Sequence, residues 1–92
     1  MRLGGYFVAN SVEELQSITD KLDCYGLSTV QAPWDLAEMS DEECREFGAA
    51  ANSLDIVVGE AGYWENLMVT DSELQNRRIR DIRTLLQKAD LM

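Results

Sequence analysis

The sequence predicts an α/β domain in which three parallel strands alternate with three helices, in the order β-α-β-α-β-α. Three times a Ser or Thr is followed three residues later by Glu, a pairing that starts helices because it satisfies free backbone N–H groups reciprocally. Three short apolar stretches precede these helices and are typical of buried strands. The second and third begin about 24 and 29 residues after their predecessors, which suits crossovers through a helix and parallel pairing.

The first unit is a strand at residues 3–8 followed by a helix that begins with Ser11 and Glu14. Apolar residues recur on one stripe of this helix, and Gly26 then supplies the left-handed conformation common at a helix end. The stripe consists of Val12, Leu15, Ile18 and Leu22.

The second unit is a strand at residues 27–31 and a helix that begins with Ser40 and Glu43. Asp41 and Glu42 suit the positive end of the helix dipole. The predicted buried side of this helix is small and consists of Cys44, Phe47, Ala51 and Leu54.

The third unit has a strand at residues 56–58, a loop at residues 59–62 and a helix that begins with Thr70 and Glu73. Glu73 and Arg77 form a favourable i,i+4 pair, and the helix continues to the end of the chain. The residues predicted to face inward are Leu74, Ile82, Leu85, Leu86 and Ala89.

The chain has 92 residues, enough for one domain with a small core, and a formal charge of −9. This charge opposes binding to a nucleic-acid backbone. Four of its eight basic residues are arginines of the third helix, which form a solvated face or a docking surface for an acidic neighbour. No apolar run of about 18 residues predicts a membrane span. With no CxxC motif and no histidine, Cys24 and Cys44 are expected to be reduced and buried, and the protein cytoplasmic.

Two architectures use parallel βα units: the doubly wound open sheet and the eight-fold TIM barrel, which typically has about 250 residues. The chain holds about three of the eight barrel units, so residues 1–92 are interpreted as a single incomplete TIM-barrel-like domain, an N-terminal fragment. Three strands leave both sheet edges open, and open edges favour association into homo-oligomers.

Few residues in the chain suit catalysis. The absence of histidine removes the usual base for a serine or cysteine nucleophile, and no nucleotide-binding glycine motif occurs. Asp35, Glu60 and Glu65 follow strand ends, where carboxylates serve either as acids and bases or as solvated loop residues. The most distinctive segment is residues 62–68, whose aromatic side chains either wall a substrate pocket or cover a neighbouring loop.

That segment, Gly-Tyr-Trp-Glu-Asn-Leu-Met, resembles the Gly-x-Trp-x-Asn-Leu motif of the sugar phosphate isomerase/epimerase family, the xylose-isomerase-like TIM barrels. Asp71 with its long helix and the final Ala-Asp-Leu-Met are also similar. The resemblance implies a substrate-binding wall formed by Tyr6 or Phe7, with Gln31, Trp34, Glu60, Trp64 and Asn66. It also implies a divalent metal, Mn, Mg or Zn, held in the complete barrel by later strands, with no cofactor or catalytic residue in this chain.

The leading hypothesis is therefore the N-terminal portion of a metal-dependent sugar or sugar phosphate isomerase or epimerase, inactive alone. The alternative is a stand-alone, self-associating interaction module. A nucleic-acid enzyme of the same barrel superfamily is a third reading, which the acidic charge disfavours.

Overall fold

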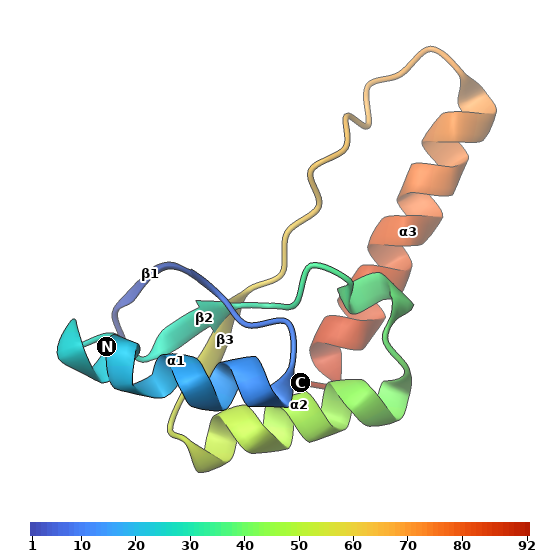
Figure 1. Cartoon of the computed structure of the whole chain (residues 1–92). Helices are drawn as coiled ribbons and strands as arrows, with labels where there is room; N and C mark the ends of the chain where they lie inside the picture. The colour runs from blue at the N-terminus through green and yellow to red at the C-terminus, as the bar shows by residue number, and fades with distance from the viewer.

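The computed structural model describes all 92 residues and contains one three-stranded parallel sheet. Its strands β1 (Gly4–Val8), β2 (Thr29–Gln31) and β3 (Val57–Glu60) lie in the order β1-β2-β3 (Figure 1). The predicted β-α-β-α-β-α order and the parallel pairing are confirmed. Strand β3 ends two residues later than predicted, because Glu60 pairs with Gln31. The Glu60 backbone carbonyl accepts a hydrogen bond from the Ala32 N–H at 2.7 Å.

Helices α1 (Val12–Cys24) and α2 (Asp41–Ser53) lie side by side on the same face of the sheet (Figure 1). Both predicted caps are present. The Ser40 hydroxyl accepts from the Glu43 N–H at 3.1 Å, and the Glu43 carboxylate accepts from the Ser40 N–H at 2.7 Å. In α1 the Glu14 carboxylate reaches one residue further back, to the Asn10 N–H. Gly26 has a φ of 68°, the left-handed conformation expected there.

Helix α3 (Ser72–Asp90) begins one residue later than predicted. Its cap is Asp71 rather than Thr70, because the Asp71 carboxylate accepts from the N–H groups of Glu73 and Leu74 at 2.9 and 3.3 Å. The C-terminal half of α3 packs near α2 and a short 3-10 helix, η1 (Leu36–Glu38). No residue of α3 is buried, and Leu86, predicted to face inward, is exposed.

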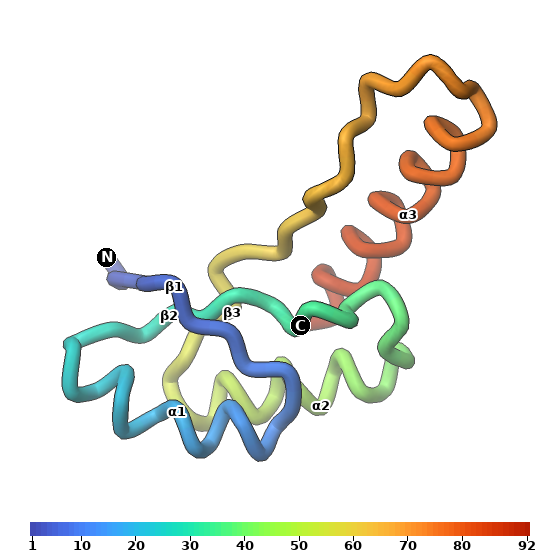
Figure 2. The backbone as a smooth tube through the Cα atoms, turned by 45° about the horizontal axis from the view of Figure 1, so that its top comes forward, coloured from blue at the N-terminus to red at the C-terminus, as the bar shows by residue number.

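Residues 63–80 form an arm that extends away from the sheet (Figures 1 and 2). Its two limbs are joined by polar contacts: the Gln75 amide donates to the Leu67 carbonyl at 3.1 Å, and Arg78 donates to the Asn66 carbonyl. The arm gives the chain a radius of gyration of 14.6 Å. A compact domain of this length would have about 12 Å.

The hydrophobic core lies between the sheet and helices α1 and α2. Its buried residues are Ala9, Leu15, Leu22, Val30, Phe47, Ala51 and Ile56. A second buried cluster, Ala32, Leu36 and Cys44, lies where η1 and α2 meet the end of α3. Cys24 was expected to be buried as well, but it is exposed because it is the last residue of α1, beyond the contact with the core.

The opposite face of the sheet is not covered by any helix (Figure 1). Tyr6 on β1 and Val57 on β3 are exposed. Thr29 lies between Gly4 and Gly59. A Cβ added at either glycine would contact the Thr29 side chain. The outer edges of β1 and β3 have no strand partner. No helix of the chain combines the length and apolar character needed to cross a bilayer.

Candidate functional site

Four of the six predicted substrate-binding residues line one small cavity at the carboxyl ends of β2 and β3. Gln31, Trp34, Glu60 and Trp64 surround a volume of about 50 Å³, together with Ala32, Pro33, Leu36, Gly62 and Leu85. The two strands bring the polar pair together, because Gln31 and Glu60 are register partners. The Gln31 amide donates to the Glu60 carboxylate at 3.5 Å.

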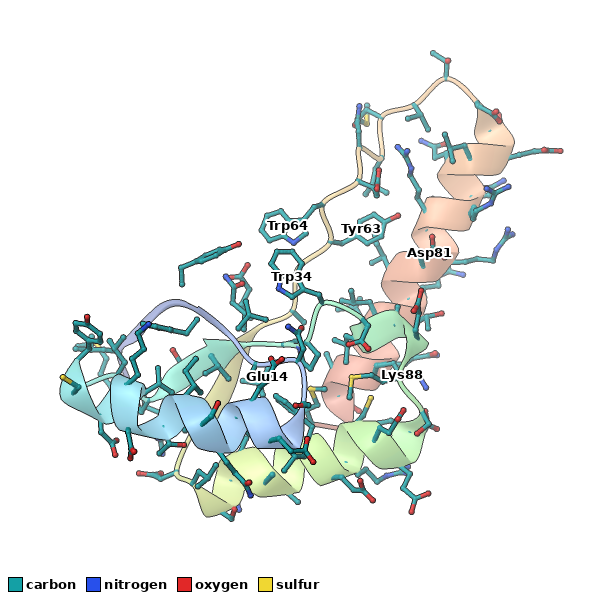
Figure 3. All side chains as sticks on the ribbon, in the orientation of Figure 1. Glu14, Trp34, Tyr63, Trp64, Asp81 and Lys88 are labelled. Atoms are coloured by element: carbon teal, nitrogen blue, oxygen red, sulfur yellow. The ribbon has the colours of Figure 1, made fainter.

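A larger cavity of about 580 Å³ adjoins the first and shares Trp34, Gly62, Trp64 and Leu85 as walls. Its other lining residues come from η1, the loop after β3 and α3: Ala37, Glu38, Tyr63, Glu65, Asp81 and Thr84. Figure 3 shows Trp34 and Trp64 close together, with Tyr63 directed toward α3 beside Asp81. We call the two cavities together the tryptophan groove. Its larger part falls within the volume range of ordinary small-molecule sites.

The backbone of Trp34 is held in place by a residue that follows β1. Its backbone N–H donates to the Asn10 side-chain oxygen at 2.9 Å, which ties the loop after β2 to the loop after β1. Pro33 and Leu36 on either side of it are buried. Trp34 as a residue is 62% exposed, so its side chain is accessible to a ligand.

Trp64 folds back over Gly62. A Cβ at position 62 would lie only 2.6 Å from a carbon of the indole ring, so any larger residue would displace the ring. Glycine at this position is therefore explained by close packing of a side chain rather than by backbone conformation. Trp64 as a residue remains 73% exposed.

Tyr63 is the tyrosine among the residues that line the larger cavity. Partial burial raises the pKa of this phenol, and the Asp81 carboxylate nearby raises it further, whereas Arg78 lowers it. The phenol therefore stays protonated at neutral pH and is available as a hydrogen-bond donor. Glu65, on the same wall, forms an ion pair with Arg78 at 3.3 Å.

Tyr6 and Asn66 do not line the groove. Tyr6 is 75% exposed on β1. The Asn66 side-chain oxygen accepts from the Met68 N–H at 2.9 Å, so this amide shapes its own loop. Asp35, the N-cap of η1, does not line the groove but a different surface depression, to which Glu38 also contributes.

Sequence reasoning missed Asn10, Asp81 and Thr84. Asp81, Thr84 and Leu85 recur at i, i+3 and i+4, so the helical period could have assigned them to one face of α3. No sequence signal relates Asn10 to Trp34, because their contact joins loops 24 residues apart.

The chain does not contain a metal-binding cluster. No three His, Cys, Asp or Glu side chains lie close enough to hold an ion, although Glu38, Glu65 and Asp81 border the same cavity. The donors present therefore do not fit a divalent metal. Burial raises the pKa of the Cys44 thiol, so Cys44 stays protonated and is a poor nucleophile.

Comparisons with protein-family models, curated proteins and solved structures found no match to this chain.

Proposed function

We propose that the chain forms the first three βα units of a TIM-barrel sugar isomerase or epimerase and supplies part of its sugar-binding mouth. The observation that carries the proposal is the tryptophan groove. It joins two indoles to a hydrogen-bonded amide and carboxylate at the carboxyl ends of parallel strands, where barrels place their ligands.

The groove has the chemistry to bind a sugar. Flat aromatic faces contact the C–H groups of a pyranose ring, and the Gln31 amide and Glu60 carboxylate are suited to its hydroxyls. Tyr63 and Thr84, which both carry hydroxyls, line the larger cavity, which has room for a monosaccharide. Sugar binding in this proposal uses Gln31, Trp34, Glu60 and Trp64, and not Tyr6 or Asn66.

The arrangement of the sheet supports a barrel rather than a doubly wound sheet. The strands lie in sequence order, and α1 and α2 cover one face only. A doubly wound sheet has helices on both faces, whereas a barrel keeps them on its outside. The uncovered face, with Thr29 between two glycines, would then line the barrel interior.

Catalysis in this proposal belongs to polypeptide other than these 92 residues. The resemblance implies a divalent metal and carboxylates that transfer protons. In a complete, cytoplasmic barrel enzyme, later strands would supply these carboxylates and the ligands of the metal. The chain alone is then expected to bind sugar without turning it over.

Intrinsic fluorescence tests sugar binding directly, because the only two tryptophans of the chain both border the groove. Titration with D-xylose or D-fructose is expected to change the emission saturably. Asn10→Ala, which frees the loop that carries Trp34, should weaken binding. Tyr25→Phe, an exposed aromatic outside the groove, is the matched control. An emission that sugars leave unchanged would contradict the proposal, and so would metal-dependent turnover by the chain alone.

The open sheet edges favour a second candidate function, a self-associating interaction module. The backbone groups on the outer edges of β1 and β3 are free to pair with another strand. Sedimentation velocity over a range of concentrations measures this association. Val57→Lys places a charge at an exposed position of β3 and is expected to weaken self-association. A chain that stays monomeric at all concentrations would rule out the interaction-module hypothesis.

A further inference from the structure

The tryptophan groove is lined by acidic side chains and by no basic one. Glu60 borders the smaller cavity, and Glu38, Glu65 and Asp81 border the larger one. Only Glu65 has an ion-pair partner, Arg78. The negative charge of the other three carboxylates is therefore not neutralised by any ion pair within the chain.

This charge acts on whatever enters the groove. The carboxylates line the same groove that a ligand would enter, and charges closer than the Debye length of about 8 Å at physiological salt are only partly screened. The surrounding body adds to the effect, since the chain carries 17 acidic and 8 basic residues. A phosphate dianion would find no lysine or arginine among the lining residues, and Arg78, the basic residue beside Glu65, is already in an ion pair, whereas a cation would be attracted.

The two indoles favour a cation as well. An ammonium group over the face of a tryptophan is attracted by the ring quadrupole, and tryptophan is the aromatic residue that binds cations best. Trp34 and Trp64 border both cavities, and each cavity is also bordered by at least one carboxylate.

We propose that the groove binds a sugar that carries an ammonium group, a protonated amino sugar, rather than a sugar phosphate. This inference rests on the proposed sugar-binding function and specifies its ligand class. The pyranose ring contacts the indoles, and the ammonium group lies toward Glu38 and Asp81. These two carboxylates border the larger cavity and have no ion-pair partner, whereas Glu60 accepts from the Gln31 amide.

The test is a fluorescence titration of the whole chain at about pH 6, where carboxylates are ionised. The ligands are D-glucosamine, D-glucose, N-acetyl-D-glucosamine and D-glucose 6-phosphate. Glucosamine is expected to bind on the order of tenfold more tightly than glucose, from the sum of a cation–π contact and an exposed ion pair. N-acetylglucosamine, in which the amine is uncharged, should lose this advantage. Glucose 6-phosphate should give no saturable change.

A charge variant locates the ammonium group. Glu38→Gln with Asp81→Asn keeps both tryptophans and is expected to weaken glucosamine binding three- to tenfold, which removes most of its advantage over glucose. Asp20→Asn with Glu42→Gln removes the same charge from exposed positions outside the groove and is the control. Circular dichroism establishes that both variants fold.

The outcomes separate this inference from the proposed function. Equal affinity for glucose and glucosamine, or binding of glucose 6-phosphate as tight as that of glucosamine, would overturn the amino-sugar inference while sugar binding stands. An equal effect of the two charge variants would also overturn it. If no sugar changes the emission, both the inference and the proposed function fail.

Discussion

The substitution Gly48→Ala tests how α3 is attached to the rest of the fold. Gly48 is buried in α2, and a Cβ added there would lie 2.8 and 2.9 Å from the Cα and carbonyl carbon of Met92. These are backbone atoms, so the end of the chain must move to accommodate an alanine. Met92 itself packs against both buried clusters.

Two opposing effects set the magnitude. Alanine in a helix interior is favoured over glycine by about 1 kcal/mol. Overpacking a filled site costs about 1–3 kcal/mol. In the whole chain the variant is therefore expected to lower the free energy of unfolding by up to about 2 kcal/mol. In a chain that lacks Met92 the clash is absent, and Gly48→Ala is expected to stabilise by about 1 kcal/mol.

Urea unfolding monitored by circular dichroism measures both effects in a double-mutant cycle. The free energy of unfolding is compared for the whole chain and for the chain ending at Leu91, each with glycine or alanine at position 48. The coupling between the two changes should be about 1–3 kcal/mol. A substitution effect that is the same in both backgrounds would show that the end of α3 does not dock on α2 as described.

Three other single substitutions test the packing of Trp64, the hydrophobic core and the cap of α2. Gly62→Ala should displace the Trp64 indole from its position over residue 62 and change the tryptophan emission, and an unchanged spectrum would contradict the packing of the ring on Gly62. Phe47→Ala empties the centre of the core and is expected to cost about 3–5 kcal/mol, measured by urea unfolding; a loss below about 1 kcal/mol would disprove its central role. The hydrogen bond from the Ser40 backbone N–H holds the pKa of Glu43 below its ordinary 4.5. The ionised Glu43 carboxylate therefore contributes its full stabilisation above pH 4.5, and this stabilisation is lost as the pH falls through the lowered pKa. Glu43→Gln should therefore flatten the acid dependence of thermal unfolding between about pH 5 and 3, and an unchanged acid dependence would contradict the reciprocal cap.

Helix starts were predictable wherever one local pattern was unambiguous. In α1 and in α2 the two residues of the capping pair are three positions apart, so no distant contact is needed to form the cap. At α3 the chain offers two adjacent capping residues, Thr70 and Asp71, and the pattern pointed to the wrong one. The carboxylate was selected because it accepts two backbone N–H groups at once.

Strand β3 shows where local preference was overruled. Gly59 and Glu60 are poor strand formers and were predicted to be in a loop. Pairing with β2 extends the strand over both residues, and the Glu60 carboxylate thereby reaches the Gln31 amide. A register of this kind depends on two segments 29 residues apart, which no local pattern encodes.

The amino-acid sequence by itself determined the succession of strands and helices, the parallel connections and the chemistry available at the strand ends, because capping, apolar periodicity and connection length act over a few residues. Only the tertiary structure decided which side chains meet. It placed α3 over η1, so that Asp81 and Glu38 border one cavity with both tryptophans, and it left Tyr6 and Asn66 outside. The physical reason is that these contacts depend on how whole elements pack, and packing is set by the summed fit of many side chains rather than by any one segment.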